Sequence, residues 1–110
     1  MQTVTPVNGN KTYTIFETGT NATSDSQMKS SIWTWFQATV TGTGAVTATV
    51  AIQGSNDNVN WSKTALATLT LSDTTSDSDG ATVISPVKYV RAVVTIVTGT
   101  GANVVVTYTA

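Results

Sequence analysis

The residues that could carry chemistry are two aspartates in an acidic stretch, Asp77 and Asp79 of the sequence SDSDG. Alternating carboxylates of this kind could bind a calcium ion, or could act as a general acid and a general base. The stretch lacks the third acidic position and the downstream bidentate glutamate of an EF-hand calcium loop. Nothing in the surrounding sequence indicates a raised pKa for either aspartate, which a catalytic pair would need. We therefore expect a plain acidic loop at this point of the chain.

Histidine and cysteine are both absent from the sequence. Their absence removes the commonest general base, the commonest thiol nucleophile and the usual ligands of transition metals. It also excludes any disulfide framework. We expect no catalytic residues, no bound metal and no cofactor, and so a protein that is not an enzyme.

Charge is scarce in this chain. Charged residues make up 10% of the 110 residues, and the formal net charge is −1. The cations are scattered along the sequence instead of forming the basic cluster that nucleic-acid binding requires; they are Lys11, Lys29, Lys63, Lys88 and Arg91. No apolar run approaches the length of a membrane span, and the N-terminal sequence MQTVTPVNGN lacks the regions of a signal peptide. We expect neither a nucleic-acid nor a membrane partner, and use without secretion.

A glycine-spaced pentapeptide, TGTGA, occurs at residues 41–45 and again at residues 98–102. A glycine loop that holds a phosphate needs a helix to follow it, because the helix N-terminus supplies the amide groups. A valine-rich segment with the pattern of a strand follows each copy. Both copies are therefore predicted to be hairpin turns.

The elements that carry these motifs are predicted to be β-strands. The chain contains 24 threonines and 15 valines, which are β-branched and favour extended backbone. Apolar residues alternate with polar or small ones at period two in segment after segment; these segments are residues 11–17, 31–40, 46–52, 65–71, 88–97 and 103–109. Turn-forming clusters separate them at residues 8–10, 54–60 and 72–80. About eight short strands at this spacing predict an antiparallel, jelly-roll-like β-sandwich.

We expect this sandwich to form a single domain over residues 1–110. Its expected extensions are an extended N-terminal segment at residues 1–10 and a polar loop or arm at residues 17–31. Segments without periodicity and of this length are usually functional or mobile.

The tryptophans are the candidate interface residues. In the strand at 31–40, Trp33 and Trp35 point outward if Ile32, Phe36, Ala38 and Val40 point inward. Two outward tryptophans would form an apolar patch of the kind that marks a protein interface. The alternative is a bulge or twist that turns one or both rings into the core.

Three further aromatic or cationic residues are candidates for an interface or for the core. Tyr89 and Arg91 share one face of their strand and are candidates for the same interface, with a solvated outer face as the alternative. Trp61 follows a polar turn, and we expect it to fill the core at the start of a strand.

The second half of the sequence resembles a known family. The segments VAIQGSNDNVNWSKTALATLTL and SPVKYVRAVVTIVTGTGANVVVTYTA, which cover about residues 50–110, are similar to small virion proteins of tailed bacteriophages. The nearest likeness is to the cement or staple proteins on the heads of epsilon15-like podoviruses.

This resemblance implies a jelly-roll-like protein on the outer surface of a phage capsid. Such a protein bridges neighbouring copies of the major capsid protein after the head has expanded, as a homodimer or, alternatively, as a trimer. Two alternatives remain open: a component of the phage tail or fibre, and a carbohydrate-binding β-sandwich module that uses Trp33 and Trp35 as a stacking platform.

Overall fold

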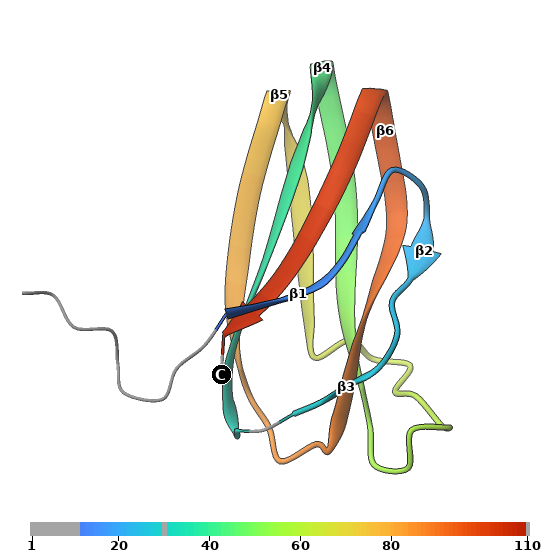
Figure 1. Ribbon diagram of the computed structural model, residues 1–110, viewed down its shortest axis with the longest axis vertical. Coiled ribbons are helices and arrows are strands. Elements are labelled where there is room, and N and C mark those ends of the chain that lie inside the picture. Colours follow the sequence, from blue (N-terminus) through green and yellow to red (C-terminus); the bar gives the residue numbers. More distant parts are fainter. Residues whose placement is uncertain (1–11, 30, 110) are drawn as a thin grey trace, which may run out of the picture.

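The protein is entirely β-structure in the part of the chain that the computed structural model describes, residues 12–29 and 31–109. Six strands form there: β1 (Thr12–Thr18), β2 (Ala22–Thr23), β3 (Gln27–Met28), β4 (Trp33–Ser55), β5 (Ala67–Ile84) and β6 (Tyr89–Thr109) (Figure 1). The described residues contain no helix, and so none that could cross a membrane. The predicted N-terminal extension, residues 1–10, lies outside the described residues.

All of these strands belong to one antiparallel sheet with the order β1-β6-β4-β5. The last strand of the sequence, β6, lies inside the sheet and pairs with β1 and with β4. Its first half also pairs with the two short strands β2 and β3, so residues 22–28, within the predicted loop or arm at 17–31, lie along β6. The serine between these short strands, Ser24, is buried and accepts a hydrogen bond of 2.9 Å from the backbone N–H of Ala92.

The three long strands are sharply bent. At about 3.3 Å per residue, a straight strand of the 23 residues of β4 would span about 75 Å, whereas the longest dimension of the molecule is 49 Å. Figure 1 shows the two halves of β4, of β5 and of β6 meeting at one end of the molecule. The sheet therefore folds back over itself at that end.

Both TGTGA sequences lie at these bends. Gly44 in β4 and Gly99 and Gly101 in β6 have positive φ angles of 78°, 120° and 64°, which side chains disfavour. The prediction that they turn the chain is confirmed, but the prediction that they form hairpins is wrong. The two halves of β4 pair with β5 and β6 instead of with each other, so each TGTGA is a corner within a single bent strand.

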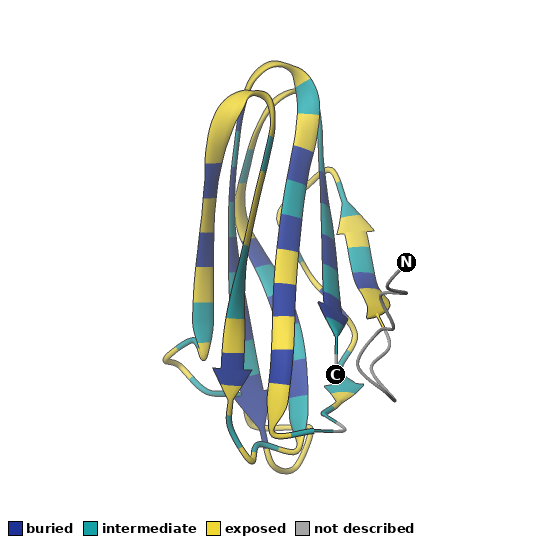
Figure 2. Ribbon diagram, turned by 90° about the vertical axis from the view of Figure 1, so that its left-hand side faces the viewer, coloured by how far each residue is buried: buried dark blue, intermediate teal, exposed yellow. Residues whose placement is uncertain are grey.

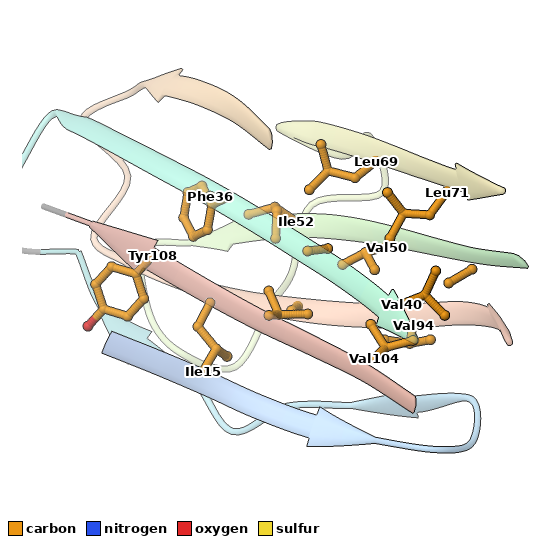
Figure 3. Packing of buried hydrophobic residues seen from close by; sticks show 14 of the residues in the cluster. Ile15, Phe36, Val40, Val50, Ile52, Leu69, Leu71, Val94, Val104 and Tyr108 are labelled. Atoms are coloured by element: carbon orange, nitrogen blue, oxygen red, sulfur yellow. The ribbon is translucent and has the colours of Figure 1, made fainter. Parts of the chain in front are cut away.

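The core lies between the two halves of the folded sheet. Alternate residues are buried along each half, which Figure 2 shows as bands of buried and exposed residues. Phe36, Val40, Val50 and Ile52, from both halves of β4, are fully buried. Figure 3 shows them in one cluster with residues of β1, β5 and β6. The period-two prediction of the inward faces is confirmed with two exceptions. Ile32 is exposed and Thr34 is buried, and Ile96, predicted to share a face with Val90, Ala92 and Val94, is exposed next to an irregularity in the pairing of β4 and β6.

The acidic stretch at residues 72–80 is a strand and not the predicted turn. It continues β5 through a corner of its own, where Thr75 has a φ of 73°. The aspartates accept hydrogen bonds from backbone N–H groups of β5 itself: Asp73 from Thr74, Asp77 from Ser72 and Ser78, and Asp79 from Gly80, at 2.7–2.9 Å. Because β5 is the last strand in the sheet order, these N–H groups lie on an edge without a neighbouring strand among the described residues.

The predicted all-β, antiparallel fold is thus confirmed. The sequence predicts about eight short strands, whereas the described residues form six, because the segments on either side of each corner belong to the same long strand.

Candidate partner interface

An exposed apolar patch lies on the outer face of the first half of β4 and the second half of β5. Trp33 pairs with Ile84 across the two strands, and Trp35 pairs with Thr82. Residues that pair across an antiparallel ladder point to the same face of the sheet. Trp33, Trp35 and Ile84 are 65%, 44% and 58% exposed. We call Trp33, Trp35, Thr82 and Ile84 the outer patch; none of these four side chains carries a charge.

The Trp35 ring is held against the sheet. A Cβ atom added at Gly80 would lie 2.6 Å from Cε2 of Trp35, so the indole packs directly on the glycine backbone of β5. Its Nε1 donates to Oε1 of Gln37 at 3.3 Å, and a row of hydrogen bonds continues from Gln37 through Ser78 to Thr39. Trp35 is thus ordered by both contacts, whereas the more exposed Trp33 stands free for contact with another molecule.

Lys29 fixes the end of the strands that carry the outer patch. Its Nζ donates to the carbonyl oxygens of Ser31, Ile32 and Ser85, the last at 2.9 Å. These carbonyls precede β4 and follow β5, so one ammonium group ties the two strand ends together. Burial lowers the pKa of Lys29 from its ordinary value, because it disfavours the charged form.

Tyr89 and Arg91 are not close to the outer patch in the sheet. They lie in the first half of β6 and pair with Ser55 and Gln53 in the second half of β4. Arg91 donates from Nε to Oε1 of Gln53 at 2.8 Å, and its guanidinium carbon lies 4.4 Å from the centroid of the Trp61 ring. The four candidates from the sequence therefore form two separate groups on opposite halves of the folded sheet.

Trp61 does not fill the core, contrary to the sequence-based prediction. It is half-buried, lies outside the core cluster and stacks with Arg91. The polar residues before it form a compact loop that ends β4, and this loop leaves the indole at the surface of the sheet. A prediction from the general burial of tryptophan could not anticipate the partner that Arg91 provides.

The sequence-based reasoning also missed two members of the outer patch. Thr82 and Ile84 follow the acidic stretch and pair with Trp35 and Trp33. Because the sequence predicts a turn at residues 72–80, it does not predict that the residues after this stretch pair with the strand of the tryptophans. The alternation of exposed Thr82, buried Val83 and exposed Ile84 is the signal that could have identified them.

The described residues contain no group of three or more histidine, cysteine, aspartate or glutamate side chains that could hold a metal ion. The outer patch offers flat apolar area bordered by hydroxyl and amide groups, which is the composition of a protein contact surface.

Comparison with known proteins gives no relative on which to base a function. No family model matches the chain, and neither a curated protein nor a solved structure is matched by it.

Proposed function

We propose that the chain is a non-enzymatic virion protein that binds the outer surface of a phage capsid through its outer patch. In this role it bridges neighbouring major capsid proteins and stabilises the expanded head. The observation that carries the proposal is the pair of exposed tryptophans beside Ile84, an apolar group on the flat face of a sheet. The resemblance of residues 50–110 to cement proteins of phage heads supplies the partner.

The proposed mechanism is mechanical. A chain that contacts two capsid subunits adds its own contacts to those that must break before the shell ruptures. A ligand that binds only the expanded shell stabilises that state by about 2.7 kcal/mol per site at 100 times its dissociation constant. A copy that is bound to one capsid subunit holds its second contact surface close to the neighbouring subunit. The second contact then forms at a high effective concentration, and this raises the overall affinity for the shell.

A finer description of the fold belongs to the same proposal. The two halves of the folded sheet enclose the core from opposite sides, and we propose that they act as the two layers of a jelly-roll-like β-sandwich. Such a body would rest on the capsid through one layer and leave the other exposed. Self-association as a homodimer, or as a trimer, would then place two or three outer patches on adjacent capsid subunits.

The first test is immunogold electron microscopy of intact virions, with antibody raised against the purified chain. Gold distributed over the heads is the expected result. Gold confined to the tail would refute the capsid role and favour a tail or fibre component. Absence of gold, with antibody access confirmed on disrupted particles, would exclude a virion role at the surface.

The second test locates the interface. Trp33→Ala is expected to weaken sedimentation of the chain with expanded capsids by about 30-fold or more, the effect of a hot-spot tryptophan worth at least about 2 kcal/mol. Ile96→Ala is the matched control, because Ile96 is 49% exposed but lies outside the outer patch. Equal loss in both variants would show that the outer patch is not the contact surface.

A further inference from the structure

A pocket of about 410 Å³ opens where β4 ends, on the half of the sheet that does not carry the outer patch. This volume lies in the range of small-molecule sites. Its lining includes the polar side chains of Asn56, Asp57 and Asn60 from the loop after β4. Trp61 and Val87 supply apolar surface to the lining. The pocket therefore offers a ligand both polar and apolar contacts.

The polar part of the lining is held in place by hydrogen bonds within the loop. Oδ1 of Asp57 accepts from the backbone N–H groups of Val59 and Asn60 at 2.9 and 2.8 Å. Its Oδ2 accepts from Nδ2 of Asn60 at 2.7 Å, and Ser55 Oγ donates to Oδ1 at 3.0 Å. The donation by Nδ2 orients the Asn60 amide, so its Oδ1 remains as an acceptor. A ligand would meet acceptors whose positions are already set.

The aromatic part of the lining is equally ordered. The Arg91 guanidinium lies 4.4 Å from the centroid of the Trp61 ring and is itself held by Gln53. A cation stacked on an indole restricts the ring, so the remaining surface of Trp61 forms a firm apolar wall. Ser62, also in the lining, accepts a hydrogen bond from the Gly54 backbone at 3.1 Å, which leaves its hydroxyl proton available to a ligand.

The charges select the class of ligand. The Asp57 carboxylate accepts four hydrogen bonds, which hold its pKa well below the ordinary value, so the group stays ionised and repels anions. A divalent cation would need several carboxylates, and Asp57 is the one acidic residue in the pocket lining. Neutral molecules with both hydroxyl groups and C–H groups satisfy both kinds of contact.

We propose that this pocket binds a neutral saccharide ring. The C–H face of the sugar packs against Trp61, and its hydroxyls donate to Oδ2 of Asp57 and Oδ1 of Asn60 and accept from Ser62, because Oδ1 of Asp57 already accepts three hydrogen bonds. This site shares no residue with the outer patch, so a test of sugar binding is independent of the proposed capsid role. It adds recognition of a glycan on the half of the folded sheet that does not carry the outer patch.

The test is titration of the ¹⁵N-labelled chain with glucose, galactose, mannose and N-acetylglucosamine, followed by two-dimensional NMR. For at least one sugar, the Trp61 indole N–H and the side-chain amides of Asn56 and Asn60 are expected to shift, with a dissociation constant of about 1–10 mM. The indole N–H of Trp33 is expected to stay in place. Trp61→Ala should weaken binding at least tenfold.

Two further variants distinguish binding in the pocket from binding at the outer patch. Asn56→Ala alters an exposed side chain of the pocket and is expected to weaken binding in a folded protein, and Trp33→Ala should leave it unchanged. Absence of shifts with all four sugars at about 50 mM would overturn the proposal, since it would place any affinity outside the useful range. Shifts centred on Trp33 and Trp35, or a preference for phosphate or calcium ions over the sugars, would overturn it as well.

Discussion

The packing of Trp35 on Gly80 leads to a quantitative prediction for Gly80→Ala. The new Cβ would lie 2.6 Å from Cε2 of Trp35 and 2.9 Å from the carbonyl oxygen of Phe36, both too close for carbon. Overpacking of this kind costs about 1–3 kcal/mol, and alanine recovers about 0.5–1 kcal/mol relative to glycine within a strand. We therefore expect the free energy of unfolding to fall by about 1 kcal/mol, and by about 2.5 kcal/mol at most.

The assay is a double-mutant cycle in guanidinium chloride at 25 °C, with the wild type, Gly80→Ala, Trp35→Ala and the double variant. Once the indole is removed, only the contact with the Phe36 carbonyl remains, so Gly80→Ala should cost clearly less in the Trp35→Ala background. Gly44→Ala is the control, because a Cβ there meets nothing within 4 Å and only its positive φ of 78° opposes the change. Its cost should be the same with and without Trp35.

The cycle can refute the packing directly. If Gly80→Ala costs the same in both backgrounds, within the roughly 0.5 kcal/mol expected of independent sites, the indole does not rest on Gly80. The outer patch would then lack the ordered tryptophan on which its description depends.

Three other predictions concern single groups. Thr75→Gly should raise the free energy of unfolding by about 0.5–1 kcal/mol, because a φ of 73° strains a β-branched residue; Thr74→Gly is the control, and a loss in both variants would contradict the strain. Lys29→Met should lower it by about 1–3 kcal/mol in urea denaturation, because the carbonyl oxygens of Ser31 and Ser85 lose the ammonium as donor, while that of Ile32 keeps the Ser85 N–H; an unchanged midpoint would show that water replaces the ammonium without cost. Asp57 has a pKa lowered by the backbone N–H groups of Asn60 and Val59, so its contribution to stability is present above its unfolded pKa of about 3.9 and is lost as the pH falls through the folded value. Asp57→Asn should therefore be less stable than the wild type at pH 7, with a difference that shrinks below about pH 4; a difference independent of pH would contradict the linkage.

The sequence was sufficient to predict the faces of individual strands. Alternation at Val46, Ala48, Val50 and Ile52 predicted a buried face, and all four are buried. The outward position of Trp33 and Trp35 followed from the same period. These results depend on neighbours two residues apart, which the local sequence contains.

The sequence was insufficient wherever a distant partner decides the outcome. Aspartates that bond to neighbouring backbone N–H groups are typical of turns, and in β5 the same bonds occupy N–H groups along an edge of the sheet. The fold therefore keeps residues 72–80 within strand β5, on either side of the corner at Thr75. The two groups of candidate interface residues likewise separate because each bent strand contributes to both halves of the sheet, a property that no short segment encodes.

The inner position of β6 has a consequence for how the protein folds during synthesis. Most of β4 is synthesised early, but it lies between β5 and β6, and among the described residues β1 pairs with β6 alone. Thr12 pairs with Thr109, and the end of β4 at Ser55 precedes Thr109 by 109 − 55 = 54 residues. At about 5–20 residues per second, a ribosome needs about 3–11 s to add that length. During this interval the apolar faces of both halves of β4 have no complete sheet to join, so the nascent chain is exposed to aggregation until β6 emerges.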